Sequence, residues 1–109
     1  MGLLTRNIEL IHEGNEVAIA MAFTGRNWSM ATYKLYVDGD LADEQSVSAF
    51  SGFLGGGVTL RGKLPPNKYH VKPLSIRFVA AMRVLRGNKY DIYVGEEQVH
   101  QETGTWGGL

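Results

Sequence analysis

The sequence predicts a mostly β fold, an antiparallel β-sandwich or flattened barrel of about seven or eight strands with one short helix. Large apolar side chains recur at every second residue along several segments, as they do in strands with one buried face. Asp38-Gly39 follows a segment rich in Tyr and Val, which is a strong signal for a two-residue hairpin turn. The chain also has 14 glycines in 109 residues, about twice the average share, which favours many tight turns. Its length fits a single domain, residues 1–109.

The first two predicted strands cover residues 7–13 and 16–24, with a turn at Gly14-Asn15 between them. The second has the clearest alternation: one side carries large apolar residues and the other carries alanines, namely Val17, Ile19, Met21 and Phe23 against Ala18, Ala20 and Ala22. A helix would scatter the four large side chains, whereas a strand collects them on one face. The alanine face indicates that another layer packs closely against it.

A hairpin is predicted next, with a strand over residues 28–37, the Asp38-Gly39 turn and a return strand. This turn would place Val37 opposite Asp40 and Tyr36 opposite Leu41. It would also place Lys34 opposite Asp43, a favourable cross-strand charge pair.

Residues 44–54 predict the short helix. Asp43 is a suitable N-cap, and apolar residues recur at helical spacing at Val47, Phe50 and Leu54. The glycines at 55–57 would end the helix.

Strand patterns return at residues 58–64, 74–85, 90–94 and 98–103. Residues 74–85 are ambiguous, because Pro73 and Gly87 could also bracket a helix. The alternative fold is therefore α+β, with that helix packed on a curved antiparallel sheet. Residues 90–94 repeat the Tyr-x-(Leu/Ile)-Tyr-Val pattern of residues 33–37, which indicates either a duplicated half-domain or two strands with the same burial pattern.

Composition favours a globular protein, with 44% apolar and 20% charged residues and a net charge of zero. The absence of cysteine excludes disulfides and thiolate metal sites. The longest apolar run, residues 17–23, is much shorter than the ~20 residues of a membrane span. The first residues lack the pattern of a secretory signal. We therefore expect a soluble, cytoplasmic protein without a membrane partner.

Charge is unevenly distributed, because every charged residue from position 55 to position 90 is basic. These cations either form a surface patch for an anionic partner or pair with acidic strands. Since the chain has no recognisable nucleic-acid-binding motif, we expect no nucleic-acid partner.

No local pattern encodes a catalytic, metal or cofactor site. The glycine-rich residues 52–57 lack the Lys and Ser/Thr of a phosphate-binding loop. His12, His70 and His100 lie in three separate segments without the close spacing of metal ligands. We therefore predict no cofactor, no metal and no catalytic residue.

Tyrosines and arginines are the candidate binding residues. Tyr36 and Tyr93 alternate with aliphatic residues that we expect to face the core, so both would contribute to an outward aromatic surface together with Trp28 or Trp106. The alternative is that both sheet faces are covered, so that the two tyrosines lie in the core with a solvated hydroxyl. Arg77 and Arg83 could bind an anionic group beside them.

The first hypothesis for the function is that the protein is a non-enzymatic binding or interaction module. It would self-associate as a homo-oligomer through a tyrosine-lined face or an edge strand. The alternative is a protein that binds a small anionic or aromatic ligand. A small enzyme with a His and carboxylate site is the third hypothesis.

Overall fold

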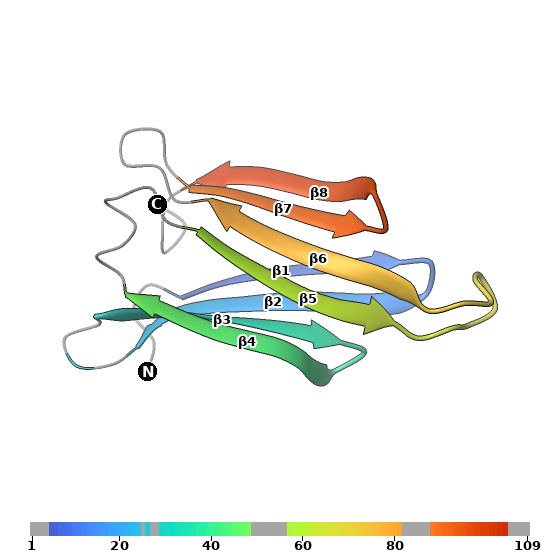
Figure 1. Cartoon of the computed structure of the whole chain (residues 1–109), viewed down its shortest axis with the longest axis horizontal. Coiled ribbons are helices and arrows are strands. Elements are labelled where there is room, and N and C mark those ends of the chain that lie inside the picture. Colours follow the sequence, from blue (N-terminus) through green and yellow to red (C-terminus); the bar gives the residue numbers. More distant parts are fainter. Residues whose placement is uncertain (1–4, 25, 27–28, 49–56, 82–87, 105–109) are drawn as a thin grey trace.

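In the part of the chain that the computed structural model describes, eight β-strands form two four-stranded antiparallel sheets (Figure 1). The structure describes residues 5–24, 26, 29–48, 57–81 and 88–104. Sheet A contains β1 (Thr5–His12), β2 (Asn15–Thr24), β3 (Met30–Val37) and β4 (Asp40–Ser48). Sheet B contains β5 (Gly57–Leu64), β6 (Leu74–Ala81), β7 (Asn88–Val94) and β8 (Glu97–Gly104). In both sheets the strands are ordered as in the chain, so each sheet is a meander.

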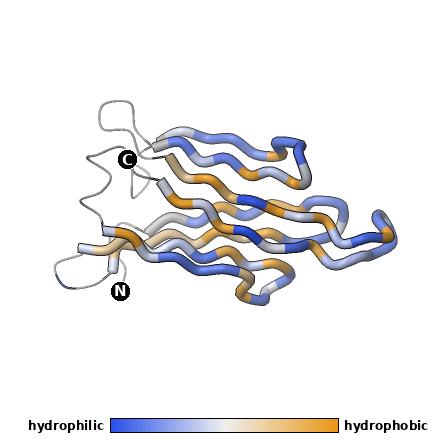
Figure 2. Tube along the Cα trace, viewed as in Figure 1, coloured by the Kyte–Doolittle hydropathy of each residue, from blue (hydrophilic) through white to orange (hydrophobic). Residues whose placement is uncertain are grey.

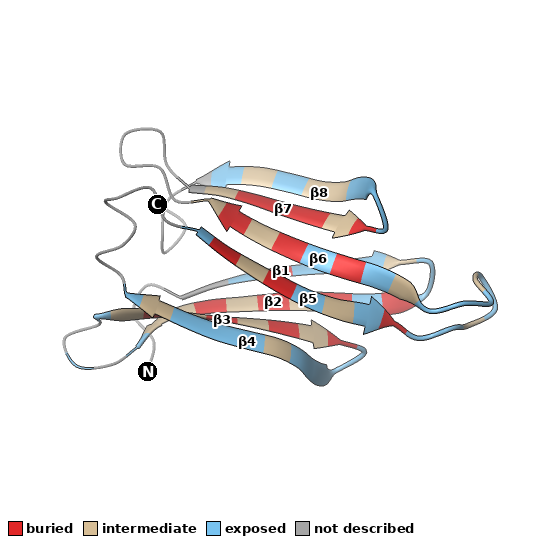
Figure 3. Cartoon of the chain, viewed as in Figure 1, coloured by how far each residue is buried: buried red, intermediate tan, exposed pale blue. Residues whose placement is uncertain are grey.

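The two sheets pack face to face around one apolar core, which makes the fold a β-sandwich. Hydropathy and burial both alternate along the strands (Figures 2 and 3). The buried apolar side chains form one core cluster with members from both sheets. Aromatic rings connect the sheets at the centre: the Phe78 ring lies 6.2 Å from the Tyr33 ring and 6.2 Å from the Tyr90 ring. The β-sandwich prediction is therefore confirmed.

Strands β4 and β5 bring the two sheets together along one side. The Asp43 carboxylate accepts a hydrogen bond of 3.0 Å from the backbone N–H of Arg61. The Gln45 side-chain amide donates to the carbonyl of Thr59 at 2.9 Å. Gly62 permits this close approach, since a Cβ at that position would lie 3.0 Å from the Cβ of Ala42. Side chains of β4 thus satisfy backbone groups at the edge of β5.

A polar network at the turn end of the sandwich holds the loop between β5 and β6. The buried side chain of Asn15 donates to Asp38 at 2.9 Å and accepts from the amide of Asn67 at 2.8 Å. The His70 Nε2 lies 2.9 Å from the same Asn15 oxygen, and its Nδ1 lies 2.9 Å from the carbonyl oxygen of Lys72. The network ties the loop to the first two hairpin turns.

The helix predicted at residues 44–54 is wrong over residues 44–48, which belong to β4. Here the backbone pairs with β3, and Ser46 adds a side-chain hydrogen bond of 2.9 Å to Thr32. Cross-strand pairing thus overrides the helical pattern. Of the three apolar residues that make this pattern, only Val47 lies among the described residues. Residues 49–54 lie outside the described residues. The described residues include no helix, and therefore none long and apolar enough to cross a membrane.

The strand prediction for residues 74–85 is confirmed over Leu74–Ala81, so the α+β alternative is wrong there. Residues 82–85 lie outside the described residues. A continuous alternation of buried and more exposed side chains along β6 decides between the two structures, because it suits a strand with one face in the core.

Two details of the hairpins differ from the prediction. The first turn is Glu13-Gly14, one residue earlier than expected, and both residues have positive φ values (45° and 84°), as two-residue hairpin turns often require. In the second hairpin the pairs next to the turn are as predicted, but Lys34 lies opposite Glu44 instead of Asp43. A β-bulge after Leu35 shifts the register there by one residue.

Candidate functional site

Tyr36 and Tyr93 both point away from the core, as alternation predicts, but they do not share a surface. Tyr36 lies on the outer face of sheet A, and Tyr93 lies on the outer face of sheet B. Since the inner faces of the sheets pack together, the two tyrosines lie on opposite sides of the sandwich. The prediction of one tyrosine surface is therefore wrong. Trp28, Trp106 and Arg83, which we expected beside them, lie outside the described residues.

Arg77 and Tyr93, in contrast, come together on the outer face of sheet B. They are direct cross-strand partners, and the guanidinium carbon of Arg77 lies 4.6 Å from the centre of the Tyr93 ring. Arg61 is the direct partner of Arg77 on the other side, and Lys63 follows two residues later on β5. These four residues, which we call the basic surface, line a shallow depression of about 510 Å³.

The cations of the basic surface have no carboxylate partner within ion-pair distance among the described residues. Asp91 lies on the same face of sheet B, but it is 3.8 Å from Lys89 and accepts a hydrogen bond of 2.6 Å from Gln98. In the described part of the chain, Arg61, Lys63 and Arg77 therefore form no side-chain ion pair with an acidic strand, although Asp43 of β4 accepts a hydrogen bond from the Arg61 backbone. Arg61 and Arg77 also lie directly opposite each other, an arrangement of like charges that destabilises a sheet.

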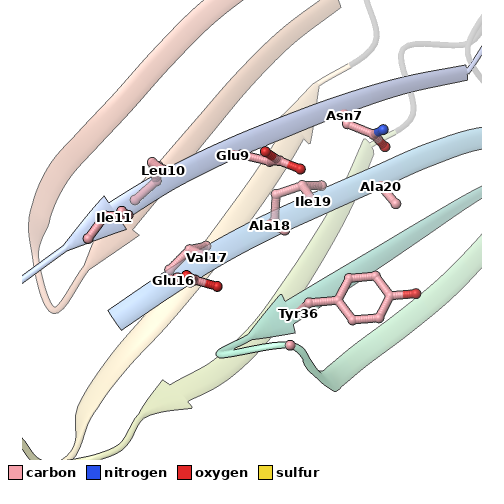
Figure 4. Close-up of a pocket in the computed structure, with 11 residues that line it drawn as sticks. Asn7, Glu9, Leu10, Ile11, Glu16, Val17, Ala18, Ile19, Ala20 and Tyr36 are labelled. Carbon is pink, nitrogen blue, oxygen red and sulfur yellow. The ribbon is translucent and has the colours of Figure 1, made fainter. Parts of the chain in front are cut away.

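The outer face of sheet A carries a larger groove of about 790 Å³, drawn in Figure 4. It runs over β1 and β2, and its lining includes the residues that we call the acidic surface: Glu9, Ile11, Glu16, Ala18, Ala20 and Tyr36. Ile11 is 72% exposed. The alanines predicted to contact another layer point away from sheet B, and no strand of the described chain covers them.

The two surfaces occupy equivalent positions in the two sheets. The register of sheet A aligns Glu9, Ala18 and Tyr36 in one row across β1, β2 and β3. The register of sheet B aligns Arg61, Arg77 and Tyr93 in the corresponding row across β5, β6 and β7. Both rows contain a tyrosine. The row in sheet A carries a negative charge and that in sheet B carries positive charges, and the small Ala18 corresponds to the long Arg77.

The equivalence extends to the backbone. Both tyrosines lie next to a β-bulge, after Leu35 in sheet A and after Ile92 in sheet B. Asp38 donates its backbone N–H to the carbonyl of Glu16, and Gly95 donates to Ser75 in the same way, each at 2.8 Å. The repeated Tyr-x-(Leu/Ile)-Tyr-Val pattern therefore marks the same place in two similar sheets.

The three histidines lie apart from these surfaces. His12 ends β1, and His70 belongs to the polar network. His100 Nε2 lies 2.9 Å from the Glu102 carboxylate on β8, but neither residue lines the depression or the groove described above. Among the described residues no three His, Cys, Asp or Glu side chains are grouped as metal ligands.

Tyr33 is a buried titratable group whose pKa is clearly raised. Burial between the sheets raises the pKa of its phenol well above the usual range, and the neighbouring Tyr90 raises it further. Since the ring lies in the core and not at either surface, this perturbation concerns stability and not chemistry.

Sequence reasoning did not select Arg61, Lys63, Glu9 or Glu16 as candidate site residues. Alternation already placed the basic pair on the outward side of residues 58–64, but only the strand register shows that Arg61 adjoins Arg77. In comparisons with known proteins, no family model, no characterised protein and no solved structure matches the chain.

Proposed function

We propose that the chain is a non-enzymatic interaction module that binds a carboxylate-bearing partner on the basic surface of sheet B. The observation that carries this proposal is the row formed by Arg61, Arg77 and Tyr93. Its two exposed cations lie side by side, and among the described residues neither cationic group has a carboxylate within ion-pair distance.

The two adjacent cations destabilise the free protein. Like charges in direct cross-strand register repel each other, and a bound carboxylate removes that repulsion. Guanidinium groups bind carboxylates through two parallel hydrogen bonds. The Tyr93 ring supports the Arg77 guanidinium from below, which limits its conformational freedom before binding.

Hexaglutamate is a suitable probe, and its binding can be followed residue by residue in the NMR spectrum of the 15N-labelled protein. We expect saturable shifts at the amides of Arg61, Lys63, Arg77 and Tyr93 at low ionic strength, where surface charges are least screened. Arg77→Glu should abolish them. Lys72→Glu makes the same charge change on the exposed β5–β6 loop and should preserve them. Absent shifts in the wild type, or equal shifts in Arg77→Glu, would contradict the proposal.

A small anionic aromatic ligand is the second candidate. The depression of about 510 Å³ beside Tyr93 favours it, because ligand pockets have volumes of about 300–1,000 Å³. Phenyl phosphate carries one ring and one anionic group and tests this candidate in the same NMR titration. Binding of phenyl phosphate but not of hexaglutamate would replace the first candidate by the second.

A further inference from the structure

We infer that the carboxylate-bearing partner is a second copy of this chain, which presents the acidic surface of sheet A to the basic surface of sheet B. This inference rests on the proposed function of the basic surface and names its partner. The observation behind it is that the acidic and basic surfaces occupy equivalent positions on opposite sides of one molecule. They differ in the sign of their charge, and one has a groove where the other has a long side chain.

Charge supports this partner first. Among the described side chains on the outward sides of β1 and β2, the charged ones are Glu9 and Glu16. On the outward sides of β5 and β6 they are Arg61, Lys63 and Arg77. None of these five residues has an ion-pair partner within the described chain. Contact between the two surfaces would pair the unneutralised charges of one copy with those of the next.

Shape supports it next. Ala18 and Ala20 leave a groove of about 790 Å³ on sheet A (Figure 4). At the position equivalent to Ala18, sheet B carries the long side chain of Arg77. Each molecule therefore has a groove in its acidic surface and a long cationic side chain on its basic surface, on opposite sides of the sandwich. The outward-facing Ala18 and Ala20, which no strand of the described chain covers, would be covered by the next copy.

Apolar contact supports it last. Ile11 is 72% exposed and Leu41, the cross-strand partner of Tyr36, is 52% exposed. Large apolar side chains at a rim of this kind are typical of a surface that contacts another protein. Together with Tyr36 they would contact the Tyr93 side of the neighbouring copy, where the charges alone would give little affinity.

The resulting interface is heterologous, since two different surfaces meet. Each added copy leaves one acidic and one basic surface free, so assembly continues beyond a dimer into a ring or a filament. An isologous dimer, in which one surface meets itself, would instead bring like charges together. The inference therefore predicts growth with protein concentration, without a limit at two chains.

Charge-reversed variants test it by sedimentation velocity. The first variant carries Glu9→Lys with Glu16→Lys, and the second carries Arg61→Glu with Arg77→Glu; all four positions are exposed, so folding should persist and can be checked by circular dichroism. We expect the wild type to associate at about 0.01 M salt, where the Debye length is about 30 Å, and to dissociate at about 1 M. Each variant alone should associate at least about tenfold more weakly, because both of its outer surfaces have the same sign.

An equimolar mixture of the two variants is the decisive sample, because it restores opposite charges at every contact and should associate again. The matched controls Glu97→Lys and Lys72→Glu, which change exposed charges elsewhere, should associate like the wild type. A monomeric wild type, variants that associate as well as the wild type, or a mixture as weak as its components would each overturn the inference. If the wild type binds hexaglutamate but remains monomeric, the inference fails and the proposed function stands. If it does neither, both fail.

Discussion

Replacing Asn15 by alanine should destabilise the protein by about 2–4 kcal/mol, because this one side chain connects three parts of the fold. It is only 4% exposed. It donates to the Asp38 carboxylate and accepts from Asn67 and His70, with donor–acceptor distances of 2.8 to 2.9 Å. A neutral hydrogen bond contributes about 1 kcal/mol net and one to a charged group about 1.5–3 kcal/mol. In the variant, water can hydrogen-bond to the partly exposed partners, so the expected loss of stability is smaller than the sum of the three hydrogen-bond contributions.

Urea unfolding at neutral pH measures the effect. A small domain has a denaturant dependence of about 1–3 kcal/mol per molar urea, and for a value of about 2 the midpoint should fall by about 1–2 M. Asn7→Ala is the matched control, since Asn7 is an exposed asparagine on β1, and its stability should stay within about 0.5 kcal/mol of the wild type. If both variants unfolded at the same urea concentration, the polar network would not hold this end of the sandwich.

Two further predictions concern the core and the contact between the sheets. The raised pKa of Tyr33 means that the folded state favours the neutral phenol, so the associated stability is present below about pH 10 and is lost as the pH rises further. Between about pH 8 and pH 11 the urea midpoint should therefore decrease less in Tyr33→Phe than in the wild type. The control variant Tyr69→Phe, at an exposed tyrosine, should show the same decrease as the wild type. Gly62→Val should cost about 1–3 kcal/mol, because its Cβ would lie 3.0 Å from that of Ala42 and 3.3 Å from a methyl group of Leu35. A second change, Ala42→Gly, should recover part of this loss in thermal unfolding; no recovery would mean that this contact is not the cause.

The sequence predicts the β-sandwich well because burial here follows the period of two. Val17, Ile19 and Met21 alternate with small or polar residues, and the structure places all three in the core. The Asp38-Gly39 turn fixes the second hairpin locally, since both residues adopt the positive φ that this turn type requires. These signals depend on neighbouring residues alone.

Prediction fails where contacts from other strands decide the structure. Residues 44–54 have helical spacing, yet pairing with β3 makes residues 44–48 extended. Lys34 lies opposite Glu44 because a bulge adds a residue, and the sequence near Ala42 carries no signal for it. The tyrosine surface failed for the same reason, because alternation tells which residues point outward but not which sheet they belong to.

The candidate site could be predicted only in part. Tyr93 and Arg77 are found from alternation and charge, and the structure brings them together. Arg61 joins them only through the register of β5 with β6, which follows a nine-residue connection at 65–73. The acidic surface could not be foreseen, because the equivalence of the two sheets includes β1 and β5, whose sequences are not alike.

Carbodiimide cross-linking tests the central claim most directly, because it joins a lysine to a carboxylate only where the two are in contact. An equimolar mixture of 14N- and 15N-labelled protein identifies peptides joined between chains by their mixed isotopic mass. Lys63 and Glu9 lie on opposite outer faces of one molecule and cannot meet within it. The account predicts mixed-isotope links from Lys63 to Glu9 or Glu16, lost at high salt. Links absent at these residues, or joining other pairs instead, would contradict it.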